Sequence, residues 1–176
     1  RNGTWYINGS ATGFSGIQFG LAGDVPVQAD YDGDRKADPA VYRNGTWFIF
    51  GSQNGFWPVQ FGVSTDTPVP ADYDGDGKTD TAVYQMSTGN WVIAQSTAGI
   101  RVHPSFGGSG FLPVPGDYDG DGEMDVGVYQ PSAGNWFIVG STDGFLQHLA
   151  FGGAGFMPVA GDYDADGKTD TAVYQA

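Results

Sequence analysis

The sequence contains no cysteine, only seven lysine and arginine residues, and two histidines. Without cysteine the chain cannot form a disulfide framework or a zinc site of the cysteine type. The basic residues are scattered, so they form no stripe that could neutralise the phosphates of a nucleic acid. No apolar run approaches the ~20 residues that a membrane-spanning helix needs. These absences argue against a disulfide-rich domain, a nucleic-acid-binding protein and a chain with a membrane span.

Acidic residues, by contrast, are abundant: 20 aspartates and glutamates give a formal net charge of −13. Sixteen of them are aspartates in four related stretches of nine residues, 30–38, 72–80, 117–125 and 162–170. In each stretch the aspartates occupy positions 1, 3, 5 and 9, an alternation that points oxygen ligands at one hard cation. Four divalent cations would bring the net charge from −13 to −5. The charge therefore indicates candidate metal loops rather than an acidic tail.

The chain repeats itself four times. Two markers recur once per unit, a tryptophan and a Phe-Gly pair: Trp5, Trp47, Trp91 and Trp136, and Phe19, Phe61, Phe106 and Phe151. The tryptophans are spaced by 42, 44 and 45 residues and the Phe-Gly pairs by 42, 45 and 45. The first aspartate of each loop follows the second spacing. The sequence thus predicts one domain over 1–176, with units at approximately 1–42, 43–84, 85–129 and 130–176.

Each unit is expected to contain four short β-strands. Around the second loop they are expected at Pro68–Tyr73, Thr81–Gln85, Asn90–Ala94 and about Gly99 to Phe106. The third strand has Trp91 and Ile93 on one face and Val92 on the other, so both faces should be covered. With 30 glycines, 10 prolines and no amphipathic stretch of useful helical length, the chain should be all-β. Four-stranded sheets at this period predict a β-propeller.

The order of the repeated segments predicts how a ring would close. Residues 1–5 repeat residues 43–47, where a third strand begins, whereas residues 171–176 correspond to a second strand. We therefore expect a β-propeller of four four-stranded blades, closed by pairing C-terminal strands 1 and 2 with N-terminal strands 3 and 4. Such a closure would leave no free sheet edge. Two alternatives are a ring of eight blades made from two chains and a piece of a longer propeller.

The four loops and the Phe-Gly pairs resemble the FG-GAP and VCBS repeats of integrin-like β-propellers. In that family a calcium loop of the form D-x-D-x-D-G-x-x-D joins the first two strands of each blade. The resemblance covers essentially the whole chain. It implies Ca²⁺ as the cofactor, with up to four ions, one per repeat. It does not fix the function, because such repeats occur in integrin heads, in fungal propeller lectins and beside catalytic domains of secreted bacterial enzymes.

The predicted ligands are the side chains at loop positions 1, 3, 5 and 9 and the carbonyl at position 7, with position 9 bidentate by the resemblance. In loop order they are Asp30, Asp32, Asp34, Lys36 and Asp38; Asp72, Asp74, Asp76, Lys78 and Asp80; Asp117, Asp119, Asp121, Glu123 and Asp125; and Asp162, Asp164, Asp166, Lys168 and Asp170. Position 6 is glycine except at Arg35, and a sharp turn there favours positive φ. We expect the first loop to bind more weakly or to use a different backbone.

A simpler alternative is that the loops are solvated turns that bind no metal, since aspartate and glycine both favour turns. Turns alone, however, need no fixed spacing of carboxylates. Two carboxylates ~4 Å apart repel by roughly 4 kcal/mol at an effective dielectric near 20, so an empty loop should be strained or partly open. Flexible loops with many oxygen ligands favour calcium over magnesium. Loops of this sort fill where calcium is near millimolar, so we expect a secreted, extracellular or periplasmic protein.

A ligand site is harder to locate in the sequence. The repeated tryptophans could stack on sugars, but their apolar neighbours favour packing between blades. Trp57 has no counterpart in the other units and is the better candidate for an exposed ligand contact. His103 and His148 both precede their Phe-Gly by three residues, so they are equivalent features of two units rather than a catalytic pair. The tyrosines at loop position 2 are expected to be packing anchors: Tyr31, Tyr73, Tyr118 and Tyr163.

Catalysis is not expected, because nearly all carboxylates belong to the loops and Asp24, Asp66 and Asp143 fall in turns. The preferred interpretation is a non-catalytic, calcium-stabilised extracellular recognition module that binds glycans. Two alternatives stay open: a protein-adhesion module resembling an integrin head, and a purely structural scaffold whose one intrinsic activity is calcium binding. The expected partners are calcium and either carbohydrate or an extracellular protein. The expected assembly is one ring per chain, or two chains forming one larger ring.

Overall fold

Short antiparallel strands build the whole described part of the chain, residues 2–142, 144 and 146–175, in this computed structural model. Three sheets have four strands each. Sheet I comprises β3 (Val25–Pro26), β4 (Ala40–Arg43), β5 (Thr46–Gly51) and β6 (Gly55–Gln60). Sheet II comprises β7 (Thr67–Pro68), β8 (Thr81–Gln85), β9 (Asn90–Gln95) and β10 (Gly99–His103). Sheet III comprises β11 (Leu112–Pro113), β12 (Val126–Gln130), β13 (Asn135–Val139) and β14 (Leu146–Ala150).

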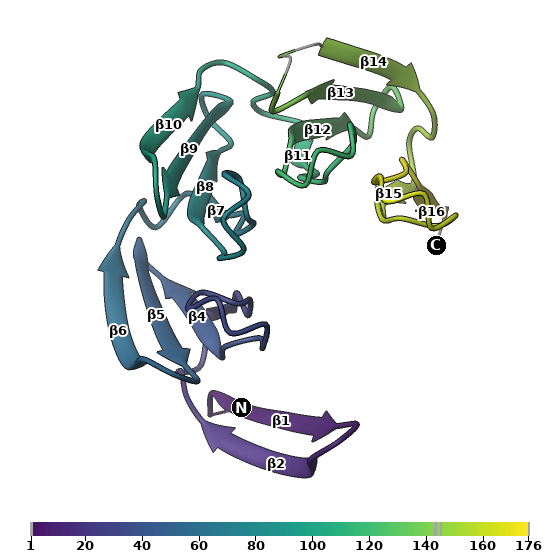
Figure 1. Cartoon of the computed structure of the whole chain (residues 1–176). Coiled ribbons are helices and arrows are strands. Elements are labelled where there is room, and N and C mark those ends of the chain that lie inside the picture. The colour runs from purple at the N-terminus through teal and green to yellow at the C-terminus, as the bar shows by residue number, and fades with distance from the viewer. Residues whose placement is uncertain (1, 143, 145, 176) are drawn as a thin grey trace.

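A two-stranded sheet lies at each end of this row. The N-terminal hairpin consists of β1 (Thr4–Gly9) and β2 (Gly13–Gln18), and the C-terminal pair consists of β15 (Phe156–Pro158) and β16 (Val173–Gln175). The five sheets stand side by side along an open arc, arranged like the blades of a propeller (Figure 1). The all-β, propeller-like architecture predicted from the repeats is therefore confirmed. None of the described segments is a helix that could cross a membrane.

The strand pairings of the described residues do not close the ring. The N-terminal hairpin and the C-terminal pair form separate sheets, and the two termini lie apart at the two ends of the arc (Figure 1). The chain thus contains three complete blades and two halves. A closed ring of four blades stays a prediction.

The first strand of each unit is shorter than the sequence suggested. We expected Pro68–Tyr73, whereas β7 covers Thr67–Pro68 and is followed by a single bridge between Ala71 and Asp80. Proline has no N–H to donate, so Pro68 and Pro70 interrupt a regular ladder. The chain still follows its neighbour, because Val69 N–H donates to the Ala82 carbonyl at 2.8 Å. The second strand, Thr81–Gln85, is where the sequence placed it.

The core lies between successive sheets. In sheet II, Trp91 and Ile93 are buried in one cluster with Val126 and Val128 of sheet III. Val92, on the opposite face of β9, packs against the cluster of sheet I. Trp47, Trp91 and Trp136 are fully buried, which confirms the predicted packing for three of the four repeated tryptophans, whereas Trp5 is half-buried. Burying one aromatic side chain of this size contributes about 2–3 kcal/mol to folding, so the alternating apolar strand holds each sheet against the next.

Neighbouring acidic loops are also linked directly. The position-8 amide of each later loop donates to the position-1 carbonyl of the loop before it: Thr79 to Asp30 at 2.7 Å, Met124 to Asp72 at 2.9 Å, and Thr169 to Asp117 at 2.6 Å. The same contact therefore recurs at three successive junctions. Because the loops connect the first and second strands, these bonds run along the inner side of the arc (Figure 1).

An ion pair distinguishes sheet I from its neighbours. Arg43 donates from Nε and from a terminal nitrogen to the Asp24 carboxylate at 2.6 and 2.7 Å, and Asp24 also accepts the Leu21 amide at 2.7 Å. The bond from Arg43 holds the pKa of Asp24 below its usual value of 3.8. In the next unit Asp66 accepts the equivalent amide of Val63 at 3.0 Å, but a glutamine, Gln85, stands in place of Arg43.

This pair of sites allows a matched comparison. Asp24→Asn should lower the free energy of unfolding at pH 7 by about 1–2 kcal/mol more than Asp66→Asn, because only the first removes a paired, nearly buried charge. The pKa of Asp24 is lower in the folded chain than in the unfolded one, so its contribution is present above about pH 4 and is lost as the pH falls further. Urea unfolding of both variants at pH 7 and pH 3 measures the difference, and equal losses at pH 7 would contradict the role of Arg43.

Candidate metal centres

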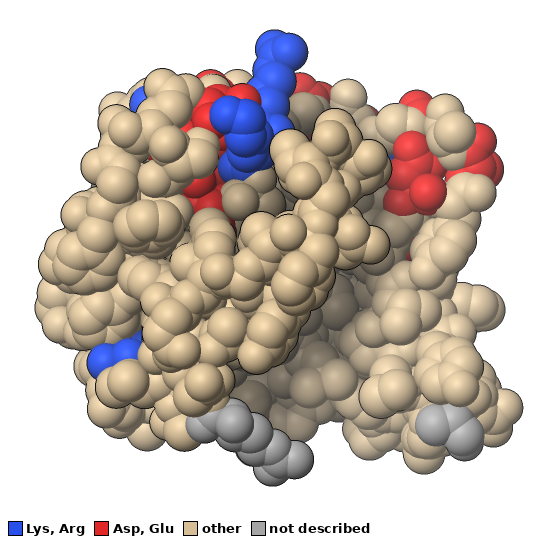
Figure 2. Space-filling view, turned by 90° about the horizontal axis from the view of Figure 1, so that it is seen from below, with Lys and Arg blue, Asp and Glu red and all other residues tan. Residues whose placement is uncertain are grey.

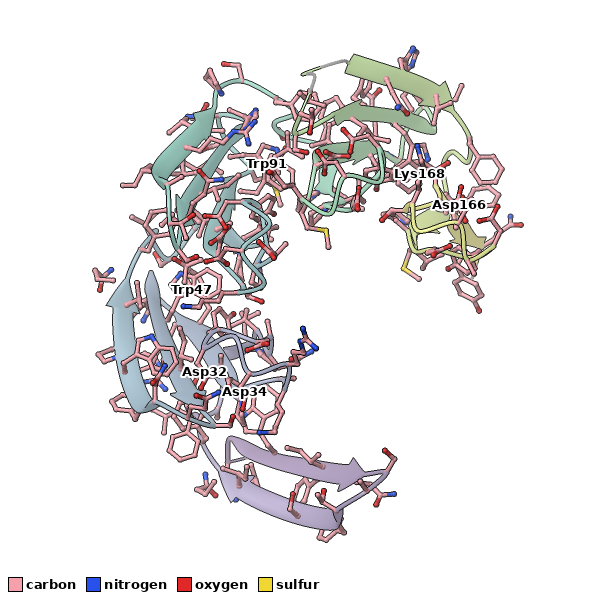
Figure 3. The ribbon with its side chains drawn as sticks, viewed as in Figure 1. Asp32, Asp34, Trp47, Trp91, Asp166 and Lys168 are labelled. Carbon is pink, nitrogen blue, oxygen red and sulfur yellow. The ribbon has the colours of Figure 1, made fainter. Side chains whose placement is uncertain are left out.

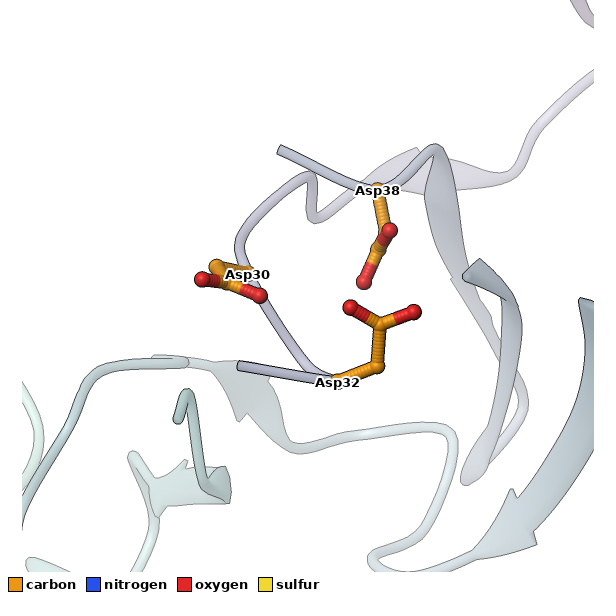
Figure 4. A group of neighbouring side chains, drawn as sticks. All are labelled: Asp30, Asp32 and Asp38. Carbon is orange, nitrogen blue, oxygen red and sulfur yellow. The ribbon is translucent and has the colours of Figure 1, made fainter. Parts of the chain in front are cut away.

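Three carboxylates converge in each acidic loop. The side chains at positions 1, 3 and 9 each offer an oxygen, and these oxygens lie within 4.8 Å of one another. The groups are Asp30, Asp32 and Asp38; Asp72, Asp74 and Asp80; Asp117, Asp119 and Asp125; and Asp162, Asp164 and Asp170. Figure 4 shows the first group, in which the carboxylates of Asp32 and Asp38 point toward each other and Asp30 faces them across the loop. Twelve of the sixteen aspartates predicted as ligands therefore lie where they could contact a shared cation.

The position-9 aspartate is the best-buried member of the group. Asp38, Asp80 and Asp125 are at most 1% exposed. Asp80 accepts the Tyr73 amide at 2.9 Å on one oxygen and the Ser96 amide at 2.7 Å on the other. Ser96 belongs to the turn between β9 and β10, the hairpin on the outer side of the blade. The Asp80 carboxylate therefore joins the acidic loop on the inner side to this outer hairpin. Bidentate binding of a cation at position 9 stays a prediction.

Position 1 closes the loop on itself. One oxygen of Asp30 accepts the amides of Gly33 at 2.7 Å and Asp34 at 3.1 Å, and the other accepts the amide of Arg35 at 2.6 Å. These are bonds of an aspartate to backbone amides a few residues ahead, which aspartate forms readily in turns. They hold the loop in a shape in which its side chains meet.

In the first two loops, the aspartate at position 3 carries an oxygen that no hydrogen bond from the described residues satisfies. Asp32 Oδ2 accepts the Gln53 amide at 2.8 Å and Asp74 Oδ2 accepts the Thr97 hydroxyl at 2.6 Å, but Oδ1 of each is buried without a hydrogen-bond partner. A buried unsatisfied carboxylate oxygen costs free energy and calls for an explanation such as a bound ion. The residues present therefore fit a hard cation coordinated by oxygen.

Position 5 lies outside these groups of three. Asp34 accepts the Lys36 amide at 2.9 Å, the Lys36 ammonium at 2.8 Å and the Ser52 hydroxyl, and Asp76 accepts the Lys78 amide at 2.8 Å and the Ser96 hydroxyl at 2.5 Å. The bonds from Lys36 and Ser52 lower the pKa of Asp34 to about 2. Asp34, Asp76, Asp121 and Asp166 thus stay predicted ligands that the structure does not group with the other three.

The sequence analysis missed a serine in the outer hairpin. Ser52, Ser96 and Ser141 donate their backbone amides to the buried position-9 carboxylates and their hydroxyls to the position-5 carboxylates. A signal was available, because each serine stands five residues after the repeated tryptophan. By the same spacing the N-terminal hairpin carries Ser10.

Within each group of three aspartates, the close spacing and burial of the carboxylates disfavour their charged form. Burial, with the neighbouring charges of Asp74 and Asp72, raises the pKa of Asp80 to about 6 although two backbone amides lower it. Burial also raises the pKa of Asp38 and Asp125. A divalent cation would reverse this effect by favouring the charged carboxylates. Acidic side chains gather at one end of the molecule, with a few lysines and arginines beside them (Figure 2).

The side chains at position 7 reach the preceding loop. Lys78 lies over Gly33, Glu123 over Gly75, and Lys168 over Gly120. Their carbonyls, with that of Lys36, stay predicted ligands. Figure 3 places Asp32 and Asp34 at one end of the row of loops and Asp166 and Lys168 at the other, with Trp47 and Trp91 between the sheets.

The backbone of the first loop matches the others. Arg35 has a φ of 67°, close to the 84°, 91° and 88° of Gly77, Gly122 and Gly167. The suggestion that Arg35 uses a different backbone is therefore wrong: the side chain is accommodated in the left-handed region. A second exception, which the sequence analysis did not note, is Ala165, with a φ of 64° at position 4, where the other loops have glycine.

Of the fourth loop, only the inner part is assembled. Asp170 accepts the Tyr163 amide at 2.9 Å, as in the other loops, but among the described residues no serine amide reaches its second oxygen. Tyr163 is 66% exposed, whereas the tyrosines at the same position of the other loops are buried packing anchors, as expected. The missing contacts are those that an outer hairpin makes in the complete blades.

The aromatic ligand candidate lies close to the first loop. Trp57, in β6, is half-buried and packs on the core of sheet I, and its indole covers Gly51, where any side chain would collide with it. On the other face of the same hairpin Phe56 is 55% exposed and Phe50 is 41% exposed. The ring of Phe48 stacks on that of Phe56 at 6.4 Å between centroids. These phenylalanines form an aromatic surface that the sequence did not single out.

The two histidines lie on neighbouring sheets. His103 is in β10 opposite Trp91, and His148 is in β14, where its ring stacks on Phe137 at 4.7 Å between centroids. The expectation that they sit one blade apart is confirmed. Asp143 lies outside the described residues.

Comparison with known proteins yields a likeness in fold. Neither a protein-family profile nor a curated protein sequence matches the chain. Among solved structures, a lectin from Agrocybe aegerita, described as recognising non-reducing terminal N-acetylglucosamine, superposes over 96% of this chain with a TM-score of 0.65 and 18% sequence identity. The chain spans 54% of the length of that lectin. At this identity the comparison shows that the two chains share a fold.

The left-handed residues give a stability test. Arg35→Gly removes the cost of a side chain at positive φ, about 1–2 kcal/mol, but adds about 0.5–1 kcal/mol of backbone entropy to the unfolded chain. We expect a net gain of about 0.5–1 kcal/mol in the free energy of unfolding, measured in urea. The reciprocal change Gly77→Arg should cost a similar amount. A loss on Arg35→Gly would mean that the arginine makes contacts worth more than the strain.

Proposed function

We propose that this chain is a non-catalytic recognition module that binds carbohydrate and is held in shape by calcium. The observation that carries the proposal is the shared fold with a lectin over nearly the whole chain. The loops are proposed to be of the FG-GAP and VCBS type, and their calcium requirement favours a secreted, extracellular or periplasmic setting, where calcium is near millimolar.

The absence of catalysis is supported by how the polar side chains are used. The loop carboxylates accept backbone amides within their own blade, and within the described part of the chain no carboxylate is hydrogen-bonded to either histidine. General acid–base chemistry needs such groups within hydrogen-bond reach of each other and of a substrate. The acidic groups are therefore better suited to holding a cation than to transferring protons.

Calcium binding is supported by three observations. Carboxylate oxygens from positions 1, 3 and 9 converge within 4.8 Å, the buried Oδ1 atoms of Asp32 and Asp74 have no partner, and the pKa of Asp80 is raised by burial and its acidic neighbours. Hard, oxygen-rich sites in flexible loops suit calcium. When bound, the ion would supply positive charge that balances the buried carboxylates, and it would do so beneath the ligand surface, without contacting a sugar.

Carbohydrate binding is most naturally placed where the units differ. Partly exposed aromatic rings can pack on the apolar face of a pyranose, and β5 and β6 carry Phe50 and Phe56 on one face and the half-buried Trp57 on the other. The equivalents of Phe50 in the other units are Asn8, Ala94 and Val139. Sheet I is therefore the candidate ligand-binding blade.

A glycan array tests the carbohydrate proposal. The parent chain should bind a subset of glycans, with terminal N-acetylglucosamine structures included among the probes. If Trp57 makes the contact, Trp57→Ala should lose about 1–2 kcal/mol, a factor of roughly 5 to 30 in affinity, while Phe56→Ala has little effect; the reverse result would assign the contact to the other face.

Ile100→Ala is the matched control, because Ile100 is an exposed apolar side chain at the position of Phe56 in sheet II. Silence of the parent across the array would remove the lectin proposal. Adhesion to an extracellular protein or a purely structural role would then be the remaining interpretations.

Chelation tests the calcium proposal. An ion present at 100 times its dissociation constant stabilises the fold by about 2.7 kcal/mol per site, so excess chelator should lower the melting temperature by several degrees or more. Asp74→Asn should remove one ion from the binding stoichiometry measured by titration calorimetry. In chelator this variant should be no less stable than the parent, because Asp74 contributes repulsion and a buried unpartnered oxygen there. An unchanged melting curve of the parent in excess chelator would contradict the calcium proposal.

A further inference from the structure

Three of the six asparagines belong to the acceptor motif of N-linked glycosylation. The motif is an asparagine, any residue except proline, and then a serine or threonine. All three asparagines are exposed. An N-linked glycan is bulky and solubilising, so an exposed acceptor is the first requirement that it places on the folded chain. The three motifs are Asn2-Gly3-Thr4, Asn8-Gly9-Ser10 and Asn44-Gly45-Thr46.

Asn44 lies at the tip of the two-residue turn between β4 and β5. Its φ is 50° and that of Gly45 is 86°, the left-handed pair that a tight hairpin turn requires and that Asn-Gly adopts readily. The Gly45 carbonyl accepts the Phe61 amide and the side-chain amide of Gln60, both at 2.9 Å, so the backbone of the turn is fixed. The Asn44 residue is exposed. A group attached to its side chain would therefore extend into solvent from a firmly held base.

Turn geometry accounts for Asn44 and Gly45 but not for the threonine that follows them. Asn54 and Gly55 form a second Asn-Gly pair, at the end of the turn between β5 and β6, and there the next residue is Phe56. A hairpin with Asn-Gly thus needs no hydroxyl two residues after the asparagine. Asn54 is exposed, as Asn44 is. Sheet I therefore contains a matched pair of exposed Asn-Gly sites, one with the acceptor motif and one without it.

The hydrogen bonding of the sheets does not demand a threonine at this position either. The Thr46 hydroxyl donates to Gln60 Oε1 at 2.7 Å. In sheets II and III the residue before the tryptophan is Asn90 or Asn135, which donates its side-chain amide to the glutamine at the end of the second strand. The repeated fold thus requires a polar side chain here, and asparagine suffices. Threonine at this place is what completes the acceptor motif in sheet I.

Asn44 lies at the end of sheet I opposite its acidic loop. β4 begins two residues after Asp38 and ends just before Asn44. Because an extended strand rises about 3.3 Å per residue, the two are separated by roughly 20 Å. The Asn54 turn, by contrast, adjoins the loop, since the Asn54 amide donates to Asp32 at 3.4 Å, and the aromatic residues of β6 follow that turn. A glycan on Asn44 would leave both the acidic loop and the candidate ligand-binding residues uncovered.

We propose that Asn44 is a site of N-linked glycosylation in a eukaryotic secretory pathway. The proposal rests on the secreted setting of the proposed function. The donor is a lipid-diphosphate-linked oligosaccharide. The side-chain nitrogen of Asn44 bonds to the anomeric carbon of the donor, the bond from that carbon to the diphosphate oxygen breaks, and the nitrogen releases a proton as the lipid diphosphate leaves. The exposed turn accommodates the product without displacing a packed side chain.

Secretion from cultured eukaryotic cells, with a cleavable signal peptide added, tests the proposal. An Asn2→Gln, Asn8→Gln form retains the motif at Asn44 alone, and its mass should exceed that of the polypeptide by at least one core oligosaccharide. Peptide N-glycosidase should remove the excess and convert Asn44 to aspartate, which peptide mass spectrometry detects. The masses are read on secreted and cell-retained chains alike.

Conservative variants at the motif provide the controls. Thr46→Ser keeps the hydroxyl and should keep the glycan, whereas Thr46→Ala should abolish it. Asn44→Asp keeps a residue suited to the turn and should also lack the glycan. Phe56→Thr completes the motif at Asn54 and should add a second glycan. A chain that carries no glycan at Asn44, or a glycan that persists at Asn44 in Thr46→Ala, would overturn the proposal.

The same preparations separate this proposal from the carbohydrate-binding one. A glycan array probed before and after removal of the glycan should give the same pattern, because Asn44 lies at the far end of sheet I from the candidate ligand-binding residues. Array binding by a chain without a glycan at Asn44 would overturn the modification alone. Silence of a chain that carries the glycan, before and after its removal, would overturn carbohydrate binding alone.

Discussion

A buried carboxylate at the centre of each complete blade holds the inner loop to the outer hairpin. Burying a charge is costly unless it is hydrogen-bonded or paired. Asp38, Asp80 and Asp125 each meet part of that cost through two backbone amides, one from their own loop and one from the serine after β5, β9 or β13. The raised pKa of Asp80 indicates that the amides alone do not compensate its charge fully. The position of the hairpin and the convergence of the other carboxylates both follow from this arrangement.

The repeat pattern predicted the sheets well because strand position and burial are local, periodic properties. The strand Thr81–Gln85 could be predicted from its pattern of apolar residues and from the turn residues around it. The shortening of the first strand could also have been predicted, since Pro68 and Pro70 have no N–H to donate to a neighbouring strand. The serines recur at a fixed spacing from the tryptophans, but the sequence does not reveal their contacts, because these join segments about 16 residues apart whose meeting depends on the folded hairpin. The conformation of Arg35 likewise comes from its neighbours, which impose a glycine-like backbone on an arginine.

Features that recur in every unit belong to the fold, and those that occur once are where specificity can arise. The tryptophans, the position-2 tyrosines and the loop aspartates recur, and in the complete blades they pack or close the structure. Sheet I departs from this regularity most, with the Asp24–Arg43 pair, the arginine stacked 4.7 Å above Phe48, and the aromatic residues of β5 and β6. A lectin-like role would therefore be carried by one blade on a scaffold built by all of them.

The side chain that each loop lays over the loop before it makes the four metal centres unequal. Lys78 and Lys168 lay cationic side chains over the first and third loops, whereas Glu123 lays an acidic one over the second. A divalent ion is held more tightly where the surrounding charge is more negative, and salt reduces the difference. The nearly identical motifs should consequently fill in a definite order, the loop at Asp72 to Asp80 ahead of its neighbours. If the loops bind calcium as proposed, partial loading at intermediate concentrations would stabilise the second loop before the first and the third.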